Sequence, residues 1–406
     1  MRFLNRLLLF SLLAAHAGTA EPIVSNVRAA QKTGTKQVVI YYDLSGTTSP
    51  ALVSLLASSD GGVSFVIPAT TLSGHVGAGV APGRNKKITW NAGVDWNNQL
   101  SNMVKFRVTA IVFAPPGQMV SIPGGTFQMG DTFSEGNAYE QPVHGVTVSA
   151  FYLQNTEVTK AQWDTVANWA AANGYDINAE GGSGKAANHP VHSVTWYQMV
   201  KYCNARSQME DLVACYTVDD GQIYKTGSRN DLVCNWNASG YRLPTEAEWE
   251  KAALGGLGGK RFPWGDTISH SQANYRVHSS NGTTNFYSYD VTPRPPGTVY
   301  DYFHPTYNDG VAPYTSPVAS FPANCYGLYD MAGNLWEWCW DWYSSDYYTT
   351  SSGSNPRGPA SGSYRVYRGG SWDYYTYYCR PVNRNFDNPD YGYDSVGFRP
   401  ARSSVP

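Results

Sequence analysis

The chain has 406 residues and a formal net charge of −2, with 29 basic and 31 acidic side chains. This balance excludes the strongly basic surface that nucleic acids and anionic lipids require, so we expect no nucleic-acid partner. Charged residues make up 15% of the chain and aromatic residues 14%, with 40 Gly and 24 Pro. Such a composition favours loop-rich, aromatic-packed domains, and the length predicts two or more hydrophobic cores.

The first twenty residues have the pattern of a secretory signal peptide. Arg2 and Arg6 precede an apolar run at 7–15, and small residues follow as far as Ala20. We expect residues 1–20 to be removed and the protein to be secreted, periplasmic or on the cell surface. The apolar run is short for a bilayer, and no later stretch approaches about 20 apolar residues, so we expect no transmembrane span.

Residues 21–114 predict a small all-β domain. Runs rich in β-branched and aromatic residues, such as Lys36–Tyr42 and Val104–Ile111, alternate with Gly, Asp and Pro. Short strands at this spacing are typical of an immunoglobulin- or fibronectin-like sandwich. Pro-Pro-Gly at 115–117 is a stiff linker and marks the expected domain boundary.

The remainder of the chain, 118–406, predicts an α+β domain with few regular elements. Residues 159–171 and 195–206 have helical spacing of apolar side chains. A third helix begins at Thr245, where Glu248 completes a capping box. The acidic residues of this third helix are expected to be solvated or to act as caps.

The C-terminal segment has an unusual polar-aromatic composition. From Trp372 to Ser395 it holds six Tyr, four Asp and three Asn. A buried strand would need aliphatic residues, and a disordered tail would carry fewer aromatics. Tyrosine offers a large contact area and a hydroxyl at low rotamer cost, which is typical of recognition surfaces. The predicted ligand-binding residues are Trp372, Tyr374, Tyr375, Tyr377, Tyr378, Tyr391 and Tyr393.

Blocks of sequence across 118–406 resemble the formylglycine-generating enzyme family, also called sulfatase-modifying factors. In chain order they are IPGGTFQMG at 122–130, TEVT at 156–159, PVHSVTW at 190–196, YRLPTEAEWE at 241–250, FPWG at 262–265, GLYDMAGNLWEW at 327–338, RGGS at 368–371 and GFR at 397–399. The resemblance implies a C-type-lectin-like formylglycine-generating-enzyme fold and a groove built by the C-terminal segment.

The same resemblance implies structural calcium, a cation that prefers oxygen ligands. The first implied ligand set is Asn274, the Tyr275 carbonyl, Asp309 and the Val311 carbonyl. The second implied ligand set is Asn334 and Glu337 with backbone groups of Gly333 and Leu335. The residues by themselves equally suit an ordinary turn at Asp309 and a helix start at Asn334.

The sequence departs from the family at the catalytic cysteines. In the enzymes, Gly-Gly-Ser-aromatic is followed by a cysteine, a histidine, and a second cysteine five positions after the first. The two thiolates bind copper(I) and support O₂-dependent oxidation of a substrate cysteine. Here Ser371 and Cys379 match the serine and the second cysteine, while Tyr374 and Tyr375 stand at the other two positions. We therefore expect no copper and a ligand-binding module; the alternative is a formylglycine-generating oxidase with Cys379 and Ser371 at its centre.

The C-terminal segment also resembles the variable proteins of diversity-generating retroelements. Those proteins use this fold as a scaffold, and mutagenesis of adenine-rich codons yields Tyr, Asp, Ser, Phe and Gly at such positions. The other interpretation is a fixed polar-aromatic loop set in an ordinary paralogue. Either interpretation leads to a binding module, whose expected partner is a protein or glycan, or a sulfatase-like peptide.

Six cysteines are present, and in an exported chain they allow fifteen pairings. Cys215 and Cys234 flank a predicted hairpin and form the expected disulfide. Cys339 is a candidate partner for Cys379. The pairing of the remaining cysteines stays open.

Overall fold

The computed structural model describes residues 22–47, 51–63, 65, 67, 69–97, 103–111, 117–177, 182–218, 220–279, 284–295 and 300–404. The expected signal peptide and the first two linker residues lie outside the described residues. The chain divides into two compact units, Met1–Phe113 and Ala114–Pro406. Within the described ranges, no helix combines the length and the apolar character needed to cross a membrane.

The first unit consists of antiparallel strands in two sheets around one core. The sheets have the orders β1-β2-β6-β4 and β5-β3-β7. Side chains of β2 alternate between buried and half-buried, so that Ile40, Tyr42 and Leu44 enter the core as the period of a strand requires. The immunoglobulin- or fibronectin-like topology stays a prediction. The elements are β1 (Ile23–Gln31), β2 (Gln37–Ser45), β3 (Ala51–Ser58), β4 (Leu72–Gly74), β5 (Gly77–Val80), β6 (Gly83–Asn91), α1 (Ala92–Asp95) and β7 (Lys105–Ile111).

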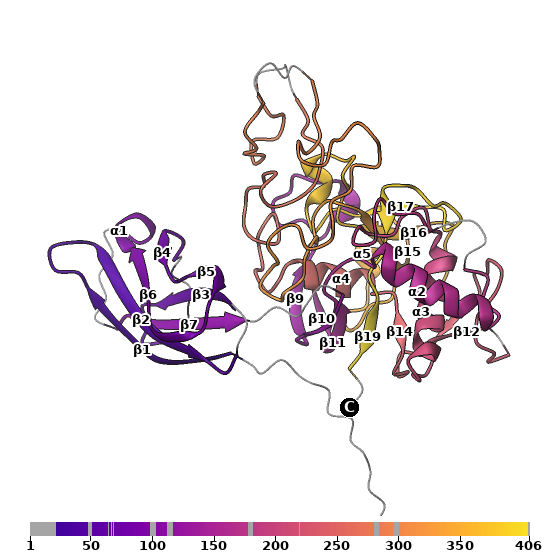
Figure 1. Cartoon of the computed structure of the whole chain (residues 1–406), viewed down its shortest axis with the longest axis horizontal. Helices are drawn as coiled ribbons and strands as arrows, with labels where there is room; N and C mark the ends of the chain where they lie inside the picture. Colours follow the sequence, from indigo (N-terminus) through magenta and orange to yellow (C-terminus); the bar gives the residue numbers. More distant parts are fainter. Residues whose placement is uncertain are drawn as a thin grey trace, which may run out of the picture. The chain divides into compact units, whose positions relative to one another are not determined.

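The second unit is mixed α+β, rich in short strands and poor in helices, as predicted (Figure 1). Its two larger sheets have the orders β14-β19-β11-β8 and β17-β16-β15-β18, and β9/β10 and β12/β13 form two-stranded pairs. Its strands are β8 (Met119–Ile122), β9 (Gly125–Met129), β10 (His144–Val148), β11 (Phe151–Gln154), β12 (Tyr216–Thr217), β13 (Val233–Cys234), β14 (Tyr241–Arg242), β15 (Trp336–Trp342), β16 (Arg365–Arg368), β17 (Asn385–Asp387), β18 (Val396–Gly397) and β19 (Ala401–Ser403).

The three predicted helices are confirmed as α2 (Lys160–Ala172), α3 (Trp196–Met209) and α4 (Glu246–Ala253), and α2 packs beside α3 (Figure 1). Each begins at a threonine with a complete capping box, including the one predicted between Thr245 and Glu248. A single further turn of helix, α5 (Tyr347–Thr350), and the 3₁₀ turns η1 (Ala138–Glu140) and η2 (Thr376–Cys379) complete the elements.

Buried ion pairs hold the C-terminal segment where regular structure is sparse. Four arginines in or next to this segment are almost completely buried, and each pairs with a buried glutamate elsewhere in the unit. The pairs are Arg368 with Glu250, Arg380 with Glu140, Arg384 with Glu246, and Arg399 with Glu337. Two of these glutamates belong to α4, so the expectation of a solvated acidic face on that helix is wrong.

Candidate functional site

The C-terminal segment leaves β16 through a turn that needs glycine. Gly369 and Gly370 have φ values of +101° and +74°, a region that side chains with a Cβ rarely adopt. A Cβ on Gly370 would also lie 2.8 Å from the Cys379 Sγ. The segment therefore turns tightly over Cys379, and the Tyr374 N–H closes the loop by donating to the Ser371 carbonyl at 3.1 Å.

Cys379 lies beneath this turn, fully buried in a hydrophobic cluster with Phe262 and Tyr275. Burial raises the pKa of its thiol. Across the described residues, that cluster contains no second cysteine, and Cys339 belongs to a different cluster. The first-cysteine position holds Tyr374, whose ring packs edge-on against Trp336 with ring centres 5.3 Å apart. A buried thiol and a phenol do not fit copper(I), which prefers soft thiolate ligands.

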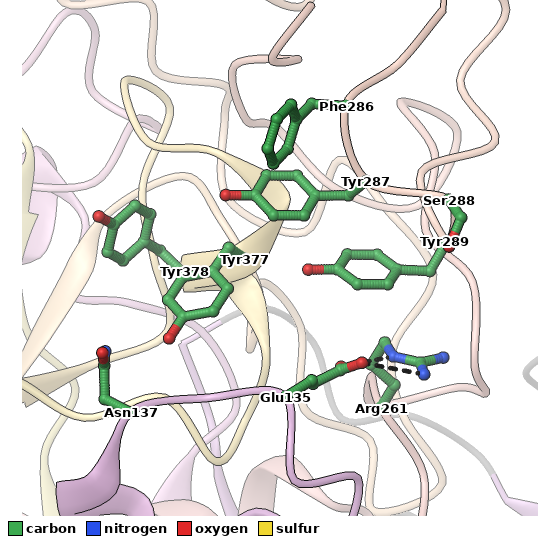
Figure 2. Close-up of a pocket in the computed structure, with 9 residues that line it drawn as sticks. All are labelled: Glu135, Asn137, Arg261, Phe286, Tyr287, Ser288, Tyr289, Tyr377 and Tyr378. Atoms are coloured by element: carbon green, nitrogen blue, oxygen red, sulfur yellow. Dashed lines mark hydrogen bonds and ion pairs between the residues drawn. The ribbon is translucent and has the colours of Figure 1, made fainter. Parts of the chain in front are cut away.

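A cavity of about 530 Å³ opens beside the segment and is walled by aromatic rings. Tyr287 stacks on Tyr289 with centroids 5.4 Å apart, and Tyr377 stacks on Tyr287 at 6.0 Å. Figure 2 shows the hydroxyls of Tyr287 and Tyr289 directed toward Tyr377 and Tyr378. Burial raises the pKa of Tyr377 to about 12, so this hydroxyl stays neutral and acts as a hydrogen-bond group.

Polar side chains complete the cavity. The Arg261 guanidinium pairs with Glu135 at 2.7 Å and lies 4.9 Å from the centre of the Tyr289 ring (Figure 2). Asn137 supplies an amide to the lining. The cavity thus combines flat apolar faces with hydroxyl, amide and paired charged groups, a composition that suits an uncharged polar ligand with a flat apolar surface.

Tyr375, at the family's histidine position, forms part of a polar cluster near the cavity. Its hydroxyl donates to Asp301 Oδ2 at 2.7 Å, and His278 Nδ1 contacts Asp301 Oδ1 at 2.9 Å. Although burial alone would raise it, hydrogen bonds from the Ser279 N–H and the Tyr375 hydroxyl, with the His278 contact, hold the pKa of Asp301 below its ordinary value. The His278 ring also packs at a tilt against Phe286, a cavity residue, with ring centres 4.8 Å apart.

The predicted binding residues fall into separate groups. Tyr377 and Tyr378 line the cavity, with Tyr374 packed against Tyr378 behind it. Trp372 is buried, and its indole N–H donates to the Asp394 carbonyl at 3.2 Å. Tyr391 and Tyr393 are exposed and pack on each other at 5.8 Å, outside the cavity lining.

Lys185 lies among the groups of the first implied calcium site. Its Nζ is 2.7 Å from Asp309 Oδ1, 3.0 Å from the Val311 carbonyl and 3.3 Å from the Pro313 carbonyl. Asn274 instead donates to the Tyr314 carbonyl, and the Tyr275 carbonyl contacts His270. An ammonium therefore already neutralises Asp309, and this set does not fit a calcium ion.

The second implied site has a different charge balance. Glu337 pairs with Arg399 through two contacts of 2.7 and 2.6 Å and accepts from the Trp249 indole. Two further buried carboxylates lie close by. Burial raises the pKa of both Glu157 and Asp330, and the Asp330 Oδ1 meets no donor.

One arginine thus faces three carboxylates around Asn334, whose amide contacts Glu157 at 3.4 Å. The raised pKa values mean that these buried acids tend to retain protons; a bound cation would replace those protons, and the orphaned Asp330 oxygen fits such an ion. No group of three or more His, Cys, Asp or Glu side chains in the described ranges is arranged to hold a metal by itself. Asn334 and backbone oxygens would therefore have to contribute ligands.

The expected Cys215–Cys234 disulfide is not seen in this structure, in which all six cysteines are free thiols. The β12–β13 register places Cys234 opposite Tyr216, with Cys215 one position further along. Cys215 precedes β12 and lies in the same hydrophobic cluster as Cys203 and Cys234, but no bond joins these thiols. The Cys339–Cys379 pair is likewise absent.

Most residues of the cavity wall were not predicted from the sequence. Phe286, Tyr287 and Tyr289 form a second aromatic run almost ninety residues before Tyr377, and Arg261 and Glu135 lie further upstream still. The density of aromatics in the run at 286–289 is the signal that could have identified it.

Comparison with known proteins identifies the relatives of the second unit. The Formylglycine-generating enzyme of Streptomyces coelicolor is 34% identical over 302 residues, covering 70% of this chain and 89% of that protein. The enzyme of Bos taurus is 31% identical over 313 residues, covering 72% and 76%. Among solved structures, Treponema denticola variable protein 1 superimposes with a TM-score of 0.52 and 31% identity, covering 70% of this chain and 94% of that one. The family model of the sulfatase-modifying factor enzyme 1-like domain matches residues 109–404, and the chain belongs to that family.

Proposed function

We propose that this protein is a ligand-binding member of the family that does not carry out the copper-dependent oxidation. The single observation that carries the proposal is the replacement of the first thiol by the Tyr374 phenol beside a cavity of stacked tyrosines. Without a second thiolate there is no two-coordinate site for copper(I). The aromatic cavity remains as the part of the groove able to hold a ligand.

The ligand is a glycan or a protein surface, as the cavity chemistry favours. Stacked rings accept the flat apolar face of a sugar or of a side chain, while Asn137 and the Arg261–Glu135 pair offer directed hydrogen bonds. Phe286 widens the aromatic wall and is itself 55% exposed. Access to solvent is needed for a ligand carried on a larger molecule.

Two parallel assays test this function. Binding is measured on an oligosaccharide array and with an immobilised Cys-x-Pro-x-Arg peptide, and turnover is followed as aldehyde formation on that peptide with copper(I) and O₂. We expect binding to a defined subset of probes and no aldehyde. Tyr287→Ala should weaken that binding about 30-fold, the effect of losing a buried aromatic anchor.

Tyr152→Ala is the matched control, because Tyr152 is a half-exposed tyrosine of β11 outside the cavity. It should bind like the unmodified protein. Aldehyde formation that Cys379→Ala abolishes would establish the oxidase instead. Equal binding by the Tyr287 and Tyr152 variants would refute a role for the cavity.

We also propose that calcium binds at the buried carboxyl groups of Glu157 and Asp330, beside the Asn334 amide. Its support is the pair of buried acids whose raised pKa values a bound cation would reverse, and the Asp330 oxygen that meets no donor. The ion would act as a structural cation and takes no part in the binding proposed for the aromatic cavity. Export follows from the signal-peptide pattern of residues 1–20 and would be checked by finding Glu21 at the mature N-terminus.

A further inference from the structure

A second cavity, of about 280 Å³, lies in the same unit and has a different chemistry. The Trp236 ring forms part of its wall and contacts two guanidinium groups. Arg357 lies 4.2 Å from the ring centre and Arg242 lies 4.9 Å from it. Stacking on an indole leaves the N–H edges of a guanidinium available to a ligand.

The two arginines differ in how their charges are balanced. Arg242 is buried and pairs with Glu248 through contacts of 2.6 and 2.7 Å. Arg357 is exposed, and among the described residues its guanidinium has no carboxylate or carbonyl partner. The charged residues of the lining are Arg242, Glu248 and Arg357, so the cavity carries one unbalanced positive charge.

The hydroxyls of the lining add donors to this charge. Ser149 Oγ accepts from the Asn355 amide at 3.1 Å, and Ser403 Oγ accepts from Arg242 Nε at 3.3 Å. Thr245 Oγ1 accepts from the Glu248 N–H at 3.1 Å. Each oxygen already accepts one hydrogen bond, so its own O–H remains to donate.

We propose that this cavity binds an oxyanion, a sulfate, phosphate or carboxylate group. Arg357 supplies the charge and a pair of parallel N–H donors, and the Ser149 and Ser403 hydroxyls supply further donors. Glu248 does not repel the anion strongly, because Arg242 neutralises it. The site is separate from the aromatic cavity and does not depend on the function proposed for it.

Calorimetric titration of the full chain with sodium sulfate, sodium phosphate and sodium acetate tests the site, with chloride as the reference at constant ionic strength. We expect at least one of the three anions to bind, and Arg357→Gln to weaken that binding about tenfold or more, as expected for losing charge-assisted hydrogen bonds. Preference for sulfate or phosphate identifies a tetrahedral group as the ligand, and preference for acetate identifies a carboxylate.

Arg229→Gln is the control, since Arg229 is an exposed arginine paired with Asp231 away from this cavity. It should leave the affinity unchanged. Binding of none of the three anions beyond chloride overturns the proposal. So does equal binding by Arg357→Gln and the unmodified chain, or equal loss in the two variants.

Discussion

Replacing Arg399 by methionine should destabilise the second unit strongly. Arg399 is fully buried, pairs twice with Glu337 and donates to the Gln154 and Tyr329 carbonyls at 3.2 and 2.9 Å. Its removal leaves Glu337 buried without its cation, beside Glu157 and Asp330. Breaking a buried pair in this way costs about 3–5 kcal/mol.

The expected change in melting temperature follows from the size of the unit. With about 290 residues its unfolding entropy is roughly 0.6 kcal/mol/K, so Tm should fall by about 5–8 °C. Tryptophan fluorescence reports on the correct unit, because only Trp90 and Trp96 of the 13 tryptophans lie in the first.

Arg402→Met is the control. It removes a half-buried arginine and one hydrogen bond to the Ser239 carbonyl, and it should lower Tm by less than about 2 °C. Adding Glu337→Gln to Arg399→Met should recover part of the loss. A shift for Arg399→Met no larger than that of Arg402→Met would refute the reasoning.

Three other measurements probe different parts of the second unit. Saturating calcium should raise Tm and EDTA should reverse the effect, whereas Asp330→Asn should remove the response; an unchanged Tm in the unmodified protein would argue against the ion. A thiol reagent should label Cys325 first, because the other five cysteines are buried, and all six should react after unfolding; rapid native labelling of Cys379 would contradict its burial. Burial lowers the pKa of His270 to about 3, so the folded state resists protonation and loses stability as pH falls below about 6.5. Between pH 6.5 and 5 that loss is at most about 2 kcal/mol relative to His270→Gln, measured by urea denaturation. A difference in stability between the two proteins that does not change with pH would show that His270 titrates normally.

Elements fixed by nearby residues were predictable from the sequence. The capping box of Thr245 and Glu248 lies within one turn of helix, so the two residue types at this spacing are enough to predict where the helix begins. The family motifs predicted the α+β fold of the second unit. The expected loss of the copper site could be predicted from Tyr374 alone, because a phenol oxygen cannot replace a thiolate as a ligand of copper(I).

Features that depend on distant partners were missed. Glu246 and Glu250 looked like solvent-facing residues of α4, but Arg384 and Arg368 reach them from more than a hundred residues away. The aromatic cavity joins the run at 286–289 to Tyr377, and no local periodicity reveals such a contact. The ion pair between Lys185 and Asp309 joins residues far apart in the chain, and no local sequence pattern predicts it.

The lysine at that loop has a practical consequence. The ammonium group of Lys185 is covalently part of the chain, so dialysis or a chelator cannot remove this positive charge from Asp309 and the Val311 carbonyl. Acylation of surface amines would remove this charge from Lys185 and so disturb the loop.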